Sequence, residues 1–495
     1  MPAADSPALV VARYLRTNNY TQVRDFLFQP SLTRPHGTEY STQTYDAFVA
    51  EAGLEPDAGM VSKGDLTLET LLEEKKSFDL NAHFEKLGVE DGERGWSQPA
   101  PTTAHVVKTL PSSSNILSTA VETTAQHTGD TATSTLLVTT ADRRLNLLDP
   151  SSHELRGSLV GLQDSPILSC AVFRQQYLLT ASMSGQLIAS NIAGSVIDKR
   201  RDHGKYIVKV AIHDDVRTPL VATAGWDCKI NIYSPSLPTA SGSTFALGEP
   251  TATITLHTKP EAMLFLPHPA TAQPILLVSK ADSSFLYYYT TEPHPRLLGH
   301  QNLAPYSNAW VAFTPSALAL CPTDSSVVAV GTSSLPHMKL LLVRLLVPPF
   351  DQAQTPSTAG PVLAQPPLRT SLLDDGPATE TQASQARAAL VIAEREAAAT
   401  LIHCTTMAPQ TAFSTPAVAW RPDGSGVWVN ADDGVVRGIE ASSGKVVCSL
   451  QGHEAGTKVR CLWAGHVEGE QGREEVVVSG GFDQRLVVWK VEASV

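Results

Sequence analysis

This sequence has few charged residues, and its cysteines do not occur in closely spaced pairs. Asp, Glu, Lys and Arg make up 17% of its 495 residues, which is low for a protein built from long helices or coiled coils. The formal net charge of −12 argues against a general nucleic-acid binder, because such a protein needs a basic face to displace counterions. The six cysteines are scattered, with no Cys-x-x-Cys pair and no histidine at zinc-ligand spacing. We therefore expect small buried thiols in a reducing compartment, with no metal, cofactor or nucleic acid bound.

Targeting and membrane signals are missing too. The N-terminal stretch MPAADSPALVVARYL contains Asp5 and has no apolar core long enough for a signal peptide. No apolar run approaches the roughly 20 residues that a membrane helix needs. These absences predict an intracellular protein, cytoplasmic or nuclear, that does not bind membranes.

Motifs of the common enzyme classes are absent as well. The chain has no Gly-rich phosphate loop, no Gly-x-Ser-x-Gly elbow and no His-Glu-x-x-His. His453-Glu454 superficially resembles an acid–base or metal site, but it opens one of the repeats described below. Asp432-Asp433 are adjacent in a turn, unlike the opposed carboxylates of a hydrolase. The sequence predicts a protein that is not an enzyme.

Short apolar segments separated by tight turns are abundant instead. From about residue 103 to the C-terminus, apolar and polar residues alternate with the period of a β-strand. Two strands around a turn containing Asp, Ser or Gly recur about seven times, each time after another apolar strand. The recurring pairs span residues 136–149, 177–192, 220–234, 276–290, 327–343, 427–440 and 476–490. Repetition on this scale predicts a mainly β fold, a seven-bladed β-propeller.

The last repeat resembles a WD repeat, whose pattern is a Gly-His start and a Trp-Asp end. Gly452-His453 precede the strand VRCLWAG, and Trp489-Lys490 stand at the end. The resemblance implies a structural hydrogen-bond tetrad made of His453, Ser479, Asp483 and Trp489. A second tetrad, in which Tyr replaces Trp, is implied for the third repeat by His203, Thr223, Asp227 and Tyr233. The other repeats are more degenerate, which leaves the blade boundaries open.

Two further segments belong to the expected propeller at 103–495. The last repeat lacks an outer strand, and the segment HVVKTL (105–110) can supply it and close the ring. Residues 348–386 are rich in Pro, Ala, Thr, Ser and Gln, which predicts a disordered insertion in the fifth blade. Its tail, ARAALVIAEREAAATLI, is expected to be helical.

Apolar side chains in residues 6–30 have helical spacing and form two sets separated by Asn18-Asn19. Two helices this short cannot bury enough area alone, so they need a partner surface. The stretch VVARYLRTNNYTQVRDFL resembles a LisH motif, although Asn19 replaces the usual Gly of its turn. The resemblance implies a homodimer formed through Val11, Tyr14, Leu15, Tyr20, Phe26 and Leu27. The alternative is a helical hairpin that docks on the protein's own body.

Between the two modules, residues 31–64 are polar and punctuated by Gly and Pro, which indicates a linker. Residues 65–95 contain apolar side chains at helical spacing, which indicates short helices.

WD-repeat proteins bind partners on the face that carries the turn before each tetrad Asp. On that face the resemblance places an expected partner-binding rim of Met183, Lys205, Tyr206, Trp226, Lys458 and Phe482. Exposed aromatic side chains among basic groups favour an acidic peptide as the ligand. The alternative is that Trp226 packs under a neighbouring loop.

A non-catalytic scaffold or adaptor is the function that the two resemblances imply together, with dimerisation through the LisH motif and partner proteins bound on the propeller rim. A ubiquitin-ligase substrate receptor is one alternative, although Trp489-Lys490-Val491 departs from the Trp-Asp-x-Arg ending that such receptors often carry. A propeller hydrolase that uses the central channel is the alternative of a different class. It would need converging acids, histidines or metal ligands at the starts of the inner strands.

Overall fold

The computed structural model describes residues 11, 12, 14, 15, 48, 49, 51, 52, 54, 95–125, 132–238, 245–307, 311–350, 382–469 and 472–492. The chain divides into two compact units, Met1–Gly92 and Glu93–Val495. None of the helices in these described parts is long and apolar enough to cross a bilayer.

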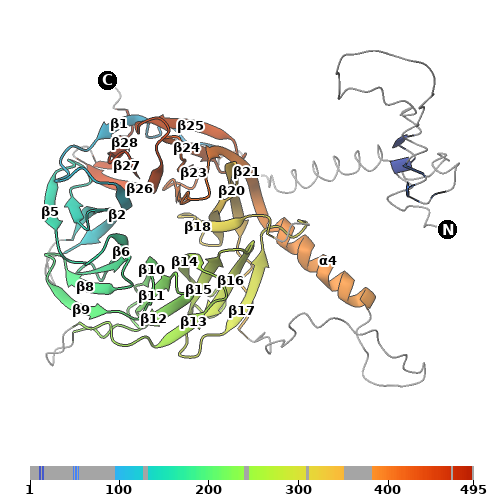
Figure 1. Cartoon of the computed structure of the whole chain (residues 1–495), viewed down its shortest axis with the longest axis horizontal. Coiled ribbons are helices and arrows are strands. Elements are labelled where there is room, and N and C mark those ends of the chain that lie inside the picture. Colours follow the sequence, from blue (N-terminus) through green and yellow to red (C-terminus); the bar gives the residue numbers. More distant parts are fainter. Residues whose placement is uncertain are drawn as a thin grey trace, which may run out of the picture. The chain divides into compact units, whose positions relative to one another are not determined.

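Seven four-stranded antiparallel sheets form the second unit and are arranged in a ring (Figure 1). Blade 1 contains β2 (Ile116–Thr124), β3 (Thr133–Thr140), β4 (Leu145–Leu148) and β5 (Leu155–Leu159). Blade 2 contains β6 (Ile167–Phe173), β7 (Tyr177–Ser182), β8 (Leu187–Asn191) and β9 (Val196–Arg200). Blade 3 contains β10 (Ile207–His213), β11 (Leu220–Gly225), β12 (Lys229–Tyr233) and β13 (Ala252–Thr255).

The remaining blades continue around the ring in chain order. Blade 4 contains β14 (Pro260–Pro267), β15 (Pro274–Lys280), β16 (Phe285–Thr290) and β17 (Leu297–Asn302). Blade 5 contains β18 (Thr314–Leu320), β19 (Val327–Ser333), β20 (His337–Arg344) and β21 (Thr400–Pro409). Blade 6 contains β22 (Val418–Trp420), β23 (Gly426–Val429), β24 (Val435–Glu440) and β25 (Val446–Gln451). Blade 7 contains β26 (Val459–Gly469), β27 (Gly472–Gly481), β28 (Leu486–Lys490) and β1 (Thr103–Val106).

Each of the seven predicted strand pairs is the middle pair of one blade, so the mainly β, seven-bladed propeller is confirmed. The apolar residues of these pairs alternate between the two faces of a blade and pack against the next blade. Leu137 of blade 1 and Leu178 of blade 2, for example, are fully buried in one cluster. Burial of one such Leu side chain contributes about 1.5–3 kcal/mol. The core therefore lies between the blades.

Blade 7 is closed by the N-terminal strand. β1 pairs antiparallel with β28, with Ala104 opposite Trp489. A segment near 105–110 was expected to supply this outer strand, and the strand observed is shifted slightly toward the N-terminus, at Thr103–Val106. The closure covers the outer edge of β28 and joins the two ends of the domain in one blade.

The segment before β1 is fixed on blade 6 by Trp96. Its ring makes an edge-to-face contact with Trp428, with the ring centroids 5.1 Å apart. The Trp96 amide donates a 2.9 Å hydrogen bond to the Glu440 carboxylate. The ring lies over Gly426 and Gly438, where a Cβ atom would come within 2.3 Å and 2.5 Å of it. The packed structure thus begins before residue 103.

The predicted disordered insertion 348–386 is wrong at both ends. His268 donates from Nε2 to the Pro348 carbonyl oxygen over 3.1 Å, and its ring centroid lies 4.5 Å from that of Phe350. Residues 382–386 belong to helix α4 (Gln382–Ala398), because the Ala-rich run that favours a helix begins earlier than expected. The helical tail itself is confirmed. The rest of the predicted insertion, 351–381, lies outside the described residues.

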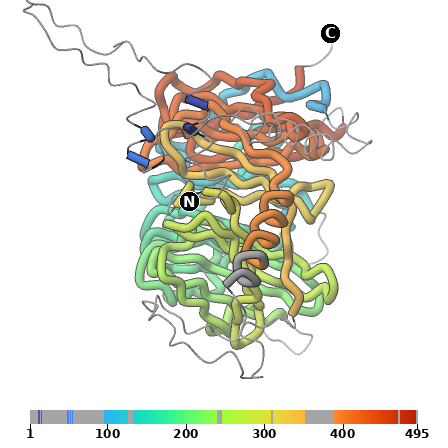
Figure 2. The backbone as a smooth tube through the Cα atoms, turned by 90° about the vertical axis from the view of Figure 1, so that its right-hand side faces the viewer, coloured from blue at the N-terminus to red at the C-terminus, as the bar shows by residue number. Residues whose placement is uncertain are grey.

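Helix α4 contacts the outer strands β17 and β21 of blades 4 and 5 (Figures 1 and 2). Near its C-terminal end, the Glu396 carboxylate is buried and accepts a 2.8 Å hydrogen bond from the Asn302 amide. This contact anchors the helix on the edge of the propeller.

In the first unit, residues 11, 12, 14, 15, 48, 49 and 51 are helical. Ala12 and Val49 are buried together, with Leu15, Phe48 and Leu54 packed against them. Residues 31–64 are therefore not a plain linker, because the apolar side chains of Phe48, Val49 and Leu54 take part in a small core. Of the predicted helices at 65–95 the structure describes Gly95 alone, and the predicted dimerisation residues Tyr20, Phe26 and Leu27 lie outside the described residues.

Candidate interaction site

The four tetrad side chains of blade 7 are joined by hydrogen bonds. Nδ1 of His453 lies 3.0 Å from the Asp483 carboxylate, and Nε2 lies 2.8 Å from the Ser479 hydroxyl. The indole nitrogen of Trp489 donates to the same hydroxyl over 3.0 Å. Because the carboxylate only accepts, Nδ1 carries the proton and the Ser479 hydroxyl donates to Nε2. Burial lowers the pKa of His453, which keeps its ring neutral.

Blade 3 repeats three of these four positions. Nδ1 of His203 lies 2.9 Å from Asp227, and its Nε2 lies 2.9 Å from the Thr223 hydroxyl. The Tyr233 hydroxyl donates to Asp202 over 3.1 Å and also interacts with Thr223 and Asn231. The side-chain nitrogen of Asn231 lies 3.2 Å from Nε2 of His203.

Both tetrads hold the turn between the two middle strands of their blade. In blade 3 the Trp226 amide donates to the Tyr206 carbonyl oxygen over 2.9 Å, and in blade 7 the Phe482 amide donates to that of Lys458 over 2.9 Å. Trp226 and Phe482 stand directly before the tetrad aspartates and are 39% and 41% exposed. A rigid turn thus presents an aromatic side chain to solvent at the same place in both blades.

Trp226 is the centre of a cluster that spans two blades. Its ring stacks on Tyr206, with centroids 5.2 Å apart and an interplanar angle of 27°. The Lys259 ammonium group, from the loop that leads into blade 4, lies 4.6 Å from the Trp226 ring centroid. Beside it, the Lys280 ammonium group lies 4.2 Å from the ring of Tyr287. These five residues are called the Trp226 cluster below.

The Trp226 cluster is positively charged. Lys205 and Lys229 are exposed beside it, and two carboxylates of blade 3, Asp227 and Asp202, pair with His203 and Arg200. The Glu261 carboxylate interacts with Lys259 without forming an ion pair. Within the described parts of the chain, none of the four lysines of this region has a carboxylate at ion-pair distance. The result is a local basic surface on a chain whose net charge is −12.

The six predicted rim residues do not form one patch. Lys205, Tyr206 and Trp226 lie together on blade 3, whereas Lys458 and Phe482 lie on blade 7, with blades 1 and 2 between them on one side. Lys458 forms a 3.1 Å ion pair with Asp432 and is therefore partly neutralised. Met183 is half-buried in the corresponding turn of blade 2, where its amide donates to the Pro166 carbonyl oxygen over 3.0 Å.

Three members of the Trp226 cluster were missed by sequence reasoning: Lys259, Lys280 and Tyr287. Lys259 directly precedes inner strand β14, as Tyr206 and Lys458 precede theirs. That shared position is a signal the sequence carries. The sequence carries no such signal for the packing of Lys259 onto Trp226 of the neighbouring blade.

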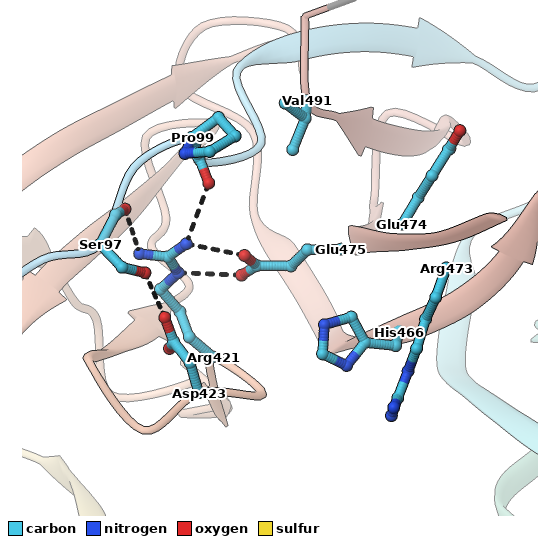
Figure 3. A pocket seen from close by; sticks show the side chains of 9 residues that line it. All are labelled: Ser97, Pro99, Arg421, Asp423, His466, Arg473, Glu474, Glu475 and Val491. Carbon is cyan, nitrogen blue, oxygen red and sulfur yellow. Dashed lines mark hydrogen bonds and ion pairs between the residues drawn. The ribbon is translucent and has the colours of Figure 1, made fainter. Parts of the chain in front are cut away.

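A polar cavity of about 380 Å³ lies where blades 6 and 7 meet the segment before β1 (Figure 3). Its centre is the buried Arg421, which pairs with Glu475 through Nε at 2.9 Å and Nη2 at 2.7 Å. Nη1 donates to the Ser97 carbonyl oxygen over 2.7 Å and to the Ser425 hydroxyl over 3.0 Å. Its donors are thus engaged within the protein, and Arg421 serves to tie three segments together.

Five Asp, Glu, Lys or Arg side chains lie on the inner strands that the structure describes: Glu122, Lys209, Glu261, Arg460 and Glu468. Burial raises the pKa of Glu122 to about 7. Among the described residues, no group of three His, Cys, Asp or Glu side chains has a geometry that could hold a metal ion.

Comparison with known proteins identifies the domain. A family model described as "UCP007778, beta-propeller domain" matches residues 96–490, from Trp96 to the end of β28. No curated protein matches the chain.

Proposed function

We propose that this chain, which belongs to the UCP007778 β-propeller family, is a non-catalytic protein-interaction scaffold of the WD-repeat type. The WD-repeat assignment is supported by the complete hydrogen-bonded tetrad of blade 7. The Trp226 cluster is the single observation that carries the binding role. Its preferred partner, in this proposal, is a protein segment rich in Asp and Glu.

The chemistry of the cluster suits such a segment. Lysines without a carboxylate partner attract acidic side chains, and the exposed faces of Trp226 and Tyr206 offer apolar area to the residues between them. An exposed cation–aromatic contact contributes about 0.5–1 kcal/mol, so Lys259 stays near the ring while its charge remains available. The backbone bond between Trp226 and Tyr206 fixes the site before binding, which reduces the entropy cost.

Binding can be tested with short fluorescent peptides rich in Asp and Glu, alongside neutral peptides of the same length. We expect Trp226→Ala to weaken acidic-peptide binding by about tenfold or more, with little change in melting temperature. Phe482→Ala is the matched control, because Phe482 has the same turn position and similar exposure in blade 7. Equal losses in both variants, or none in Trp226→Ala, would contradict the site.

We further propose that the N-terminal segment dimerises the scaffold as a LisH-type module. The buried contact of Ala12 with Val49 supports a small helical core, while Val11 is 36% exposed and free of that core. Light scattering should give a dimer for the full chain and a monomer for residues 95–495. Val11→Glu should yield a folded monomer, and a monomeric wild-type chain would rule the dimer out.

A further inference from the structure

The loop between β21 and β22 carries an exposed threonine followed by proline. Residues 410–417 make this loop on the same face as the tetrad turns, and Phe413 within it is 87% exposed. Thr415 is exposed and directly precedes Pro416. The residue before a proline is biased toward an extended conformation, because the proline ring clashes with a helical one. The position thus combines exposure with an extended backbone.

Asn430 fixes the loop against the start of blade 7. Its side-chain nitrogen donates to the carbonyl oxygens of Thr415, over 2.8 Å, and of Val459, over 2.7 Å. Thr415 is thereby held beside Arg460, the second residue of β26. Nη1 of Arg460 donates a hydrogen bond to the Thr415 hydroxyl.

The guanidinium group of Arg460 carries a positive charge that no carboxylate of the described residues pairs with. Arg460 is half-buried, and burial lowers the pKa of its guanidinium group. The nearby acid, Asp432, is occupied by Lys458 at 3.1 Å and by the Ser414 hydroxyl at 2.5 Å. Among the described residues, no carboxylate forms an ion pair with Arg460. An anion placed on Thr415 would therefore gain a charge-assisted hydrogen bond at once.

We propose that Thr415 is a phosphorylation site for a proline-directed protein kinase, and that Arg460 binds the phosphate. The Thr415 hydroxyl oxygen attacks the γ-phosphorus of ATP, a new O–P bond forms, and the bond from that phosphorus to the bridging β,γ-oxygen breaks. The hydroxyl proton passes to the kinase's base, and ADP leaves. The phosphate then has about −1.5 to −2 charge at pH 7, next to an unpaired guanidinium.

Thr218-Pro219 is a matched control within the same chain. Thr218 is also exposed and also precedes a proline, in the loop between β10 and β11. Its amide and hydroxyl face the Asp215 carboxylate, at 3.3 Å and 3.5 Å. A phosphate there would be repelled by Asp215, which accepts from Thr218, whereas the Thr415 hydroxyl accepts from the Arg460 guanidinium.

The test uses the full chain, ATP and a purified proline-directed kinase, with phosphate located by mass spectrometry. We expect modification of Thr415 in the wild type and its absence in Thr415→Ala. Phosphorylation should raise the melting temperature by about 1–2 °C, and Arg460→Gln should abolish that rise. An unmodified Thr415 would overturn the proposal.

A second measurement needs no variant at position 460. In a ³¹P titration, a neighbouring guanidinium stabilises the dianion, so the phosphate pKa should be lower in the folded protein than in urea. A phosphate on Thr218, introduced by ligation, should titrate higher in the folded protein. Equal values for phospho-Thr415 in folded and unfolded protein would overturn the pairing with Arg460.

Discussion

The Ser479 hydroxyl accepts a 3.0 Å hydrogen bond from the indole nitrogen of Trp489. The same hydroxyl donates to His453, so one small side chain satisfies two buried groups on either side of it. Such groups are costly when left unpaired, because they have lost their water.

We predict that Ser479→Ala lowers the free energy of unfolding by at least about 2 kcal/mol, because both partners lose a bond. Thr223→Val in blade 3 removes the equivalent hydroxyl but should cost about half as much. There His203 retains Asn231 at 3.2 Å, and Tyr233 bonds to Asp202. Urea unfolding of both variants measures the difference; equal losses would contradict the prediction.

Gly438→Ala should destabilise blade 6. The new methyl group would lie 2.5 Å from the Trp96 ring and 2.9 Å from that of Trp428, so Trp96 must leave its site. The expected cost is about 1–3 kcal/mol in urea unfolding. Gly204→Ala is the control, since a Cβ there meets nothing within 4 Å. If both variants unfold at the same urea concentration, the packing of Trp96 contributes nothing to the stability of the blade.

Glu122→Gln should make the protein less sensitive to pH. Burial raises the pKa of Glu122 from 4.5 to about 7, so the folded state holds this proton more tightly than the unfolded state. The free energy of folding contributed by the protonated form is fully present below about pH 4.5. It is lost as the pH rises through about 7, and the loss is up to about 3 kcal/mol. The variant should therefore be the more stable one at pH 8 and similar to wild type at pH 4.5, as measured by thermal melts. Glu154→Gln, which makes the same change at an exposed position, is the matched control.

Removal of β1 should open the ring. A chain of residues 95–495 retains Trp96 and the strand that pairs with β28, whereas a chain of residues 107–495 exposes the β28 edge. We expect the shorter chain to melt at a lower temperature and to aggregate, because an unpaired edge strand pairs with other chains. Light scattering during a thermal melt detects both effects, and identical melts would show that closure is dispensable.

The propeller was predictable because the sequence patterns of its strands and turns are local and repeated. Each middle strand pair carries its own alternation and turn, and the last repeat also carries its whole tetrad in sequence order. Contacts between repeats could not be inferred in this way. The stacking of Lys259 on Trp226 and the insertion of Trp96 over Gly438 depend on how blades meet in space. Phe48 and Val49 were missed for a different reason, since their apolar signal is only a few residues long.

The pairing of Ala104 with Trp489 also has a consequence for synthesis. The two residues come from opposite ends of the domain, so the ribosome releases the first strand long before its partner exists. Until β28 emerges, the nascent β1 has a hydrogen-bonding edge and no native strand to occupy it. Such long-range pairing slows folding, and the ring can first become cooperative only after β28 has left the ribosome.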